Sequence, residues 1–142
     1  MRILVVEDDA ETAAYLVSGL EEDGHAASRA VNGRDGLFLA MTENFDLLFL
    51  DIYMPGMDGF EAMRMVREQR PQLPVIVISG RPLTAETEST PDFLTMATKL
   101  GAVSGLEKPF RPADLLAAVA DCLETAGSGT PSYPTGGVAS ST

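Results

Sequence analysis

The chain has 142 residues, a formal net charge of −11 and 45% hydrophobic residues, which is enough for one domain with a buried core. The acidic balance argues against contact with nucleic-acid backbones or anionic membrane surfaces, and the single cysteine, Cys122, excludes an internal disulfide. The sequence contains neither a signal-peptide pattern nor an apolar run of membrane-spanning length. We therefore expect a soluble, cytoplasmic protein that binds neither nucleic acid nor membrane.

Five short segments of the sequence predict β-strands. Residues 47–50 (LLFL) and 75–78 (VIVI) are apolar throughout, which is typical of strands buried on both faces of a parallel sheet. Residues 25–31 are less apolar, which favours a strand at the sheet edge. The five predicted strands are residues 2–6, 25–31, 47–50, 75–78 and 102–106.

Segments with apolar residues at helical spacing alternate with these strands. Asp9 is placed to cap the first helix, and Asp23-Gly24 ends it. The second helix follows the turn at Asn32-Gly33. The other predicted helices are residues 59–69, residues 92–100 with Phe93, Met96, Ala97 and Leu100 on one face, and residues 112–125 with Leu115, Leu116, Val119 and Leu123 buried.

Strict alternation of strand and helix predicts an α/β fold. We expect a doubly wound, flavodoxin-like sheet of five parallel strands in the order 2-1-3-4-5, between two helical layers in a three-layer α/β/α arrangement. The single domain is predicted over residues 1–125. Residues 126–142 are rich in Gly, Ser, Thr and Pro and are predicted to form a disordered tail.

Acidic residues follow two of the predicted strands. Glu7 and Asp8 come directly after the first strand, and Asp51 ends the third. Parallel strands bring their carboxyl ends to one edge of the sheet, where ligands bind in such folds. Clustered carboxylates repel one another unless a cation lies among them, and oxygen ligands suit Mg²⁺, with Mn²⁺ as a second candidate. Asp8 and Asp51 are the predicted direct ligands, with Glu7 acting through water and the backbone carbonyl of Tyr53 within reach.

The same edge carries groups suited to phosphoryl chemistry. A carboxylate beside Mg²⁺ can act as a nucleophile towards phosphorus and form an aspartyl phosphate, which makes Asp51 the predicted acceptor. Ser79 ends the fourth strand and Lys108 follows the fifth, so both can bind phosphoryl oxygens. Each residue alone has a commoner structural explanation, such as a helix cap or a solvated lysine. Their combination in this order is specific.

Four motifs carry a resemblance to a known family: ILVVEDD, LLFLDIYMPGMDGF, VIVISG and EKPF. Over residues 1 to about 125 the chain resembles the receiver domain of two-component response regulators, in particular the single-domain type similar to chemotaxis regulators. The resemblance implies that Asp51 accepts a phosphoryl group from a histidine kinase or a histidine phosphotransfer protein. It implies Asp8, Asp51 and the Tyr53 carbonyl as Mg²⁺ ligands with Glu7 in support, Ser79 and Lys108 on the phosphoryl group, and a cis Lys108-Pro109 bond.

The sequence departs from this family pattern in two places. Gly105 stands where the family usually carries the aromatic switch residue. The connection after Ser79 is about seven residues longer than usual, and we predict that residues 81–93 are mobile before phosphorylation and form part of a partner interface. Tyr53 and Arg81 flank the predicted phosphoryl pocket and are expected to tune the lifetime of the aspartyl phosphate.

The expected function is that of a stand-alone receiver, since no output domain follows residue 125 in this sequence. Phosphorylation would switch binding to a downstream protein, pass the phosphoryl group on, or promote a homodimer. No enzyme activity is expected beyond self-phosphorylation and slow autodephosphorylation.

Three alternatives stay open at the level of sequence. A phosphate-independent pseudoreceiver would fit Gly105. A Mg²⁺-dependent phosphohydrolase with an aspartyl nucleophile is disfavoured, because Tyr53 and not an acid lies two residues after Asp51. The chain could also be a fragment of a larger regulator, with its tail as a linker.

Overall fold

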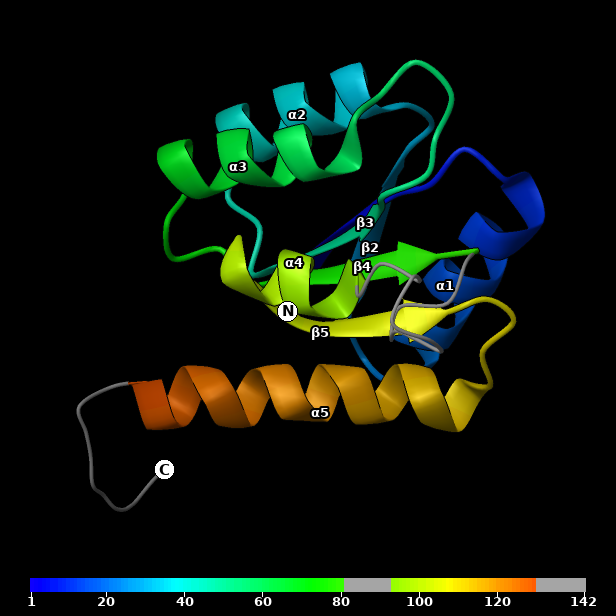
Figure 1. Ribbon diagram of the computed structural model, residues 1–142. Coiled ribbons are helices and arrows are strands. Elements are labelled where there is room, and N and C mark those ends of the chain that lie inside the picture. The colour runs from blue at the N-terminus through cyan, green and yellow to red at the C-terminus, as the bar shows by residue number, and fades with distance from the viewer. Residues whose placement is uncertain (81–92, 130–142) are drawn as a thin grey trace, which may run out of the picture.

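The computed structural model describes residues 1–80 and 93–129, with side chains in the second range as far as Leu123. Its five strands form one parallel sheet in the order β2-β1-β3-β4-β5, which confirms the predicted order (Figure 1). The strands are β1 (Arg2–Val6), β2 (Ala26–Ala30), β3 (Leu47–Asp51), β4 (Val75–Ser79) and β5 (Ala102–Glu107).

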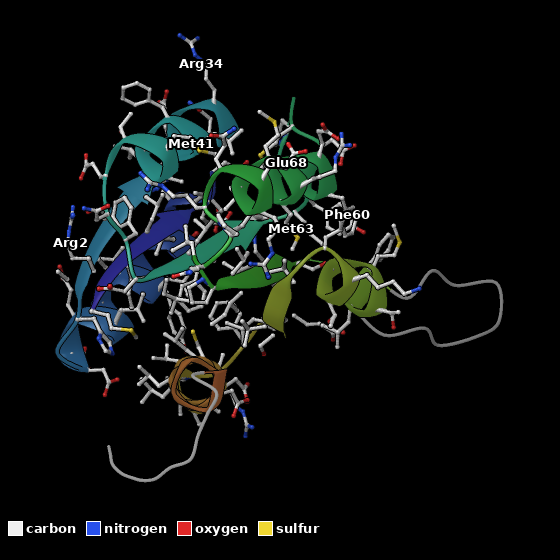
Figure 2. All side chains as sticks on the ribbon, turned by 90° about the vertical axis from the view of Figure 1, so that its left-hand side faces the viewer. Arg2, Arg34, Met41, Phe60, Met63 and Glu68 are labelled. Atoms are coloured by element: carbon white, nitrogen blue, oxygen red, sulfur yellow. The ribbon has the colours of Figure 1, made fainter. Side chains whose placement is uncertain are left out.

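Helices cover both faces of this sheet. They are α1 (Ala10–Glu22), α2 (Gly33–Thr42), α3 (Gly59–Gln69), α4 (Phe93–Lys99) and α5 (Pro112–Gly129). Buried residues of α1 and α5 pack on one face, and those of α2, α3 and α4 pack on the other. Figure 2 shows α2 and α3 side by side above the sheet and α5 end-on below it. The predicted three-layer α/β/α arrangement is therefore confirmed.

The alternation of side chains along each central strand explains the two helical layers. In β3, Leu48 and Leu50 face the layer of α2, α3 and α4, whereas Leu47 and Phe49 face α1 and α5. The same alternation holds in β1 and β4. Both faces are therefore apolar, and the carboxyl ends of the strands are the place where polar side chains can enter.

Aspartate and asparagine side chains start three helices at this end of the sheet. Asp9 accepts a hydrogen bond from the Thr12 backbone N–H, Asn32 accepts one from Asp35, and Asp58 accepts from the first turn of α3. The predicted Asp9 cap is confirmed. Such caps keep the connections short, so the residues that follow each strand are held close to the sheet edge.

The last helix differs from its prediction. α5 continues to Gly129, so residues 126–129 are helical and not part of a tail, while residues 130–142 lie outside the described part of the chain. Gly127 and Gly129 lower helix propensity, but each keeps its backbone N–H donor. Pro131 is the first residue after Thr125 that lacks this donor.

The predicted burial of Leu116 and Leu123 is wrong. Leu116 and Leu123 are 40% and 50% exposed, and Met96 is 45% exposed. α5 buries the stripe formed by Leu115, Ala118, Val119 and Cys122. A helix that packs against one sheet covers only a narrow stripe, so apolar residues at its margin stay exposed. None of the helices in the described residues is long and apolar enough to cross a membrane.

Gly59 marks a close contact between α3 and the end of β3. A Cβ added at Gly59 would lie 2.4 Å from Ile52 Cα and 2.5 Å from its carbonyl oxygen, which are backbone atoms that cannot rotate away. We expect Gly59→Ala to lower the free energy of unfolding by about 3 kcal/mol, measured by urea denaturation. Gly80→Ala is the control, because nothing lies within 4 Å of its added Cβ, and an equal loss in both variants would contradict the steric explanation.

Candidate functional site

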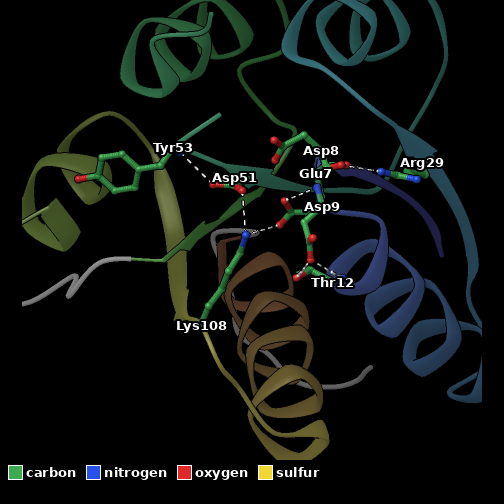
Figure 3. A network of polar contacts seen from close by, with 8 residues as sticks. All are labelled: Glu7, Asp8, Asp9, Thr12, Arg29, Asp51, Tyr53 and Lys108. Atoms are coloured by element: carbon green, nitrogen blue, oxygen red, sulfur yellow. Dashed lines mark hydrogen bonds and ion pairs between the residues drawn. The ribbon is translucent and has the colours of Figure 1, made fainter. Parts of the chain in front are cut away.

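The carboxyl ends of β1, β3 and β4 bring three buried polar side chains into the sheet edge. Glu7, Asp51 and Ser79 have exposed fractions of 0%, 1% and 0%. Glu7 and Asp51 lie where the connections from β1 and β3 diverge to opposite faces, at the switch point of the doubly wound sheet (Figure 3). Ser79 ends the next strand, β4. Charged groups this deep need partners, and those partners define the site.

Asp51 is held through both carboxylate oxygens. Its Oδ2 lies 3.0 Å from the Lys108 ammonium, and its Oδ1 accepts a hydrogen bond of 2.9 Å from the backbone N–H of Tyr53. One contact comes from the residue after β5, and the other comes from the loop directly after β3 (Figure 3). The carboxylate orientation is therefore set by groups far apart in the sequence.

Glu7 is the most unusual ionisable group of the site. Its Oε2 accepts a 3.1 Å hydrogen bond from the Asp9 backbone N–H. Its Oε1 lies 3.0 Å from Lys108 Nζ in an ion pair that lacks the direction of a hydrogen bond. Burial, followed by a hydrogen bond shared with Asp51, raises the pKa of Glu7 to about 7, although the contacts with Lys108 and the Asp9 amide act in the opposite direction.

Lys108 bridges the two buried carboxylates. Partial burial opposes its charge, but its close contacts with the Glu7 and Asp51 carboxylates outweigh this and raise the pKa of the ammonium. Its backbone N–H donates to the Ser79 carbonyl at 2.7 Å, which fixes the residue beside the end of β4. The Lys108-Pro109 peptide bond is cis, as the resemblance implied.

A set of carboxylate oxygens suitable for a metal ion lies at the centre of the site. One oxygen from each of Glu7, Asp8 and Asp51 lies within 4.8 Å of the others, and Asp8 is exposed at the rim. Hard oxygen donors of this kind, with an open side for water, fit Mg²⁺. Lys108 offsets the charge of the two buried carboxylates.

Arg29 is a residue of this site that sequence reasoning missed. Its guanidinium donates to the backbone carbonyls of Glu7 at 3.1 Å and of Asp8 at 3.0 Å. It belongs to the weak edge strand β2, where it lies opposite Val5 of β1. Only the register of β2 against β1 shows that Arg29 reaches the end of β1, so no local pattern could have identified it.

The remaining predicted positions lie around this centre. Gly105 lies in β5 opposite Val77 and carries no side chain. The Tyr53 ring packs edge-to-face on Phe93 of α4, with ring centroids 5.5 Å apart. Arg81 and the predicted mobile segment, except for Phe93, fall outside the described residues. The functional roles assigned to all these residues remain predictions.

The raised pKa of Glu7 predicts a pH dependence of stability in chelator-treated, metal-free protein. The folded state holds this proton up to about pH 7, whereas the unfolded chain releases it near 4.5. The stabilisation is therefore complete below pH 4.5 and is lost as the pH rises to about 7, with a change of at most about 3 kcal/mol.

We expect Glu7→Gln to remove this dependence, measured by urea denaturation across that pH range. Glu68→Gln, a matched change at an exposed position of α3, should behave like the wild type. A Glu7→Gln curve parallel to that of the wild type would contradict the assignment.

The fold and the site together define a class: a doubly wound α/β domain with an acidic, lysine-bridged site at the switch point of its sheet. Residues 3–120 match the family model described as the response regulator receiver domain. The chain therefore belongs to the response regulator receiver domain family, which confirms the resemblance seen in its motifs.

Curated relatives of the chain are longer proteins. It is 39% identical to the probable transcriptional regulatory protein SilR of Salmonella typhimurium over 123 residues, which make up 87% of this chain and 51% of SilR. It is 37% identical to the transcriptional regulatory protein CusR of Escherichia coli K12, with the same shares covered. The chain thus spans about half the length of the curated relatives that it matches.

Solved structures of similar fold include proteins of about the same size. A CheY-like response regulator receiver domain protein from Methanospirillum hungatei has a TM-score of 0.80 at 26% identity, covering 90% of this chain and 97% of the other. The chemotaxis protein CheY4 of Vibrio cholerae has a TM-score of 0.71 at 29% identity, covering 84% and 95%.

Proposed function

We propose that this receiver domain accepts a phosphoryl group on Asp51 and uses it to switch binding to a protein partner. The observation that supports this most directly is the environment of Asp51. A carboxylate that is 1% exposed lies 3.0 Å from the Lys108 ammonium, within a set of three carboxylates suited to a divalent cation. A purely structural aspartate at a strand end would not need a second buried acid and a shared lysine beside it.

The proposed step is a transfer between two nucleophiles. A carboxylate oxygen of Asp51 forms a bond to phosphorus while the P–N bond of a phosphohistidine breaks, and the imidazole nitrogen leaves with the electron pair of that bond. Lys108 is placed to bind a phosphoryl oxygen once its contact with Asp51 is released. The Ser79 hydroxyl, at the end of β4, is assigned to a second oxygen. No further catalytic base is needed, because Asp51 reacts in its ionised form.

The residues present fit a magnesium ion. Asp8, Asp51 and the backbone carbonyl of Tyr53 would hold it, with Glu7 acting through a water molecule. When bound, Mg²⁺ neutralises charge on the phosphoryl oxygens and on the carboxylates. Arg29 keeps the carbonyls of Glu7 and Asp8 in place and so orients this part of the site. Mn²⁺ has the same preference for oxygen ligands and would serve as a substitute.

The donor and the partner follow from the family. Receiver domains are phosphorylated by histidine kinases, and they are generally not enzymes. We assign the donor here to a histidine kinase or a histidine phosphotransfer protein, with self-phosphorylation and slow dephosphorylation as the accompanying reactions. The net charge of −11 supports a protein partner over nucleic acid for this domain. A cytoplasmic location and dimerisation on phosphorylation belong to the same proposal.

Two organisations are compatible with this role. The receiver could act alone, as we predicted, or it could belong to a longer regulator, because the transcriptional regulators that it resembles are about twice as long. The intact mass of the protein isolated from its native cells distinguishes them. A mass matching 142 residues supports the stand-alone role, whereas a larger mass overturns it.

The test of the proposed function is phosphoryl uptake by the wild-type protein. Incubation with acetyl phosphate and Mg²⁺, followed by intact mass spectrometry, should show the gain of one phosphoryl group. The gain should be lost when a chelator replaces Mg²⁺. No uptake under either condition would overturn the proposal and favour a receiver that binds partners without phosphate.

A further inference from the structure

Three aromatic rings join the loop after β3 to the starts of two helices. Tyr53 lies in that loop, Phe60 lies in the first turn of α3, and Phe93 is the first residue of α4. The Phe93 ring is the central one: it packs edge-to-face with Tyr53 at 5.5 Å and stacks on Phe60 at 5.9 Å with an interplanar angle of 21°. Figure 2 shows Phe60 on the part of α3 that lies near α4.

The residue held by Phe93 also organises the phosphoryl-transfer site. The backbone N–H of Tyr53 donates to Asp51 Oδ1 at 2.9 Å. The carbonyl of the same residue is the proposed backbone ligand of the metal ion. A change in the position of the Tyr53 side chain would therefore move both the hydrogen bond that orients Asp51 and an atom of the metal site.

We propose that Phe93 is a positioning residue for the phosphoryl-transfer site, acting through the Tyr53 ring and backbone. The inference rests on the proposed function and extends it to α4. Aromatic pairs hold a preferred relative geometry that aliphatic contacts of the same size do not. Phe93 therefore links the start of α4 to Asp51, and a shift of α4 changes the orientation of the acceptor.

This linkage acts in both directions. If the position of α4 affects metal and phosphoryl binding at Asp51, then binding at Asp51 must affect the position of α4 to the same extent. Gly105 of β5 has no side chain that could respond to a change at the site. Phe93, in contrast, is connected to the site through its ring contact with Tyr53. The start of α4 is thus the part of the surface that this site would move.

The test compares Phe93→Ala and Phe93→Leu with Leu94→Ala in the full chain. Leu94 is the matched control, because it is also partly buried against the same core in the first turn of α4. One readout is the Mg²⁺ dissociation constant, measured by titration calorimetry. The other is the hydrogen-exchange rate of the Tyr53 amide, measured by NMR in metal-free protein. Thermal unfolding establishes that each variant is folded, and Phe93→Leu keeps most of the apolar volume should the alanine variant unfold.

We expect both Phe93 variants to weaken Mg²⁺ binding, by up to about tenfold, and to speed exchange of the Tyr53 amide, while Leu94→Ala leaves both unchanged. In a double-mutant cycle, Tyr53→Leu should remove most of the effect of Phe93→Leu. Additive effects, or equal effects of the Phe93 and Leu94 changes, would overturn the inference. Failure of the wild type to bind Mg²⁺ would instead overturn the proposed function, and the exchange rate of the Tyr53 amide would still decide the role of Phe93.

Discussion

Asp51→Asn should abolish the uptake of a phosphoryl group. The amide that replaces the carboxylate is a poor nucleophile towards phosphorus, and Asp51 is the proposed acceptor, held between the Lys108 ammonium at 3.0 Å and the Tyr53 N–H at 2.9 Å. With acetyl phosphate and Mg²⁺, the wild type should gain one phosphoryl group that hydroxylamine removes. The variant should keep its unmodified mass.

The matched control for this prediction is Asp46→Asn. Asp46 lies just before β3, at the opposite end of the strand, where its carboxylate accepts a hydrogen bond from the Arg2 backbone N–H. This variant should be phosphorylated to the same extent as the wild type. Uptake by Asp51→Asn would show that another residue is the acceptor, and a peptide map of the modified protein would identify it.

Lys108→Met should separate phosphoryl transfer from metal binding. Lys108 is the cation that lies 3.0 Å from both Glu7 and Asp51. Its removal takes away the group placed to stabilise charge on the transferred phosphoryl group, so the rate of uptake should fall by at least about tenfold. It also removes a positive charge that competes with a divalent cation for the same carboxylates. The affinity for Mg²⁺ should therefore rise.

This opposite change in two measurements distinguishes the role of Lys108 from general damage to the site. Uptake is followed by intact mass over time, and the affinity for Mg²⁺ is measured by titration calorimetry. Lys99→Met at the end of α4 is the control, since Lys99 is exposed and should be neutral in both measurements. Loss of Mg²⁺ binding together with uptake in Lys108→Met would argue that the lysine serves the fold and not the transfer.

The three variants differ in what they leave intact. Asp51→Asn removes the proposed acceptor itself, whereas Lys108→Met keeps it and removes the cation beside it. Phe93→Leu keeps both and alters the ring contacts of Phe93 with Tyr53 and Phe60. We expect Asp51→Asn to abolish uptake, Lys108→Met to slow it and Phe93→Leu to change the affinity for Mg²⁺. This graded response would support the separate roles proposed for the three residues.

The sequence alone determined the fold and predicted which residues meet at the candidate site. Each central strand is a short apolar run such as LLFL or VIVI, and each helix has its own apolar stripe. The alternation of strands and helices along the chain predicts a doubly wound parallel sheet. Since parallel strands share one carboxyl edge, the positions of Glu7, Asp8, Asp51, Ser79 and Lys108 along the chain were enough to predict that they meet. This prediction combines local sequence patterns with one rule of topology, the shared carboxyl edge of parallel strands.

Tertiary structure decided the features that depend on contacts between distant segments. Glu7 is fully buried and has a raised pKa, while its neighbour Asp8 is exposed. Two identical residue types on one helix, Leu115 and Leu116, are buried and exposed respectively. Arg29 reaches the carbonyls of Glu7 and Asp8, and Phe93 reaches Tyr53, although neither contact has a signature in the sequence.

The physical reason is a difference of scale. Periodicity and capping are set by residues within one or two turns of each other, so they can be deduced from the sequence. Burial, ion-pair geometry and ring contacts depend on how helices dock on the sheet and on the register of one strand against another. These are properties of the assembled layers and not of any single segment.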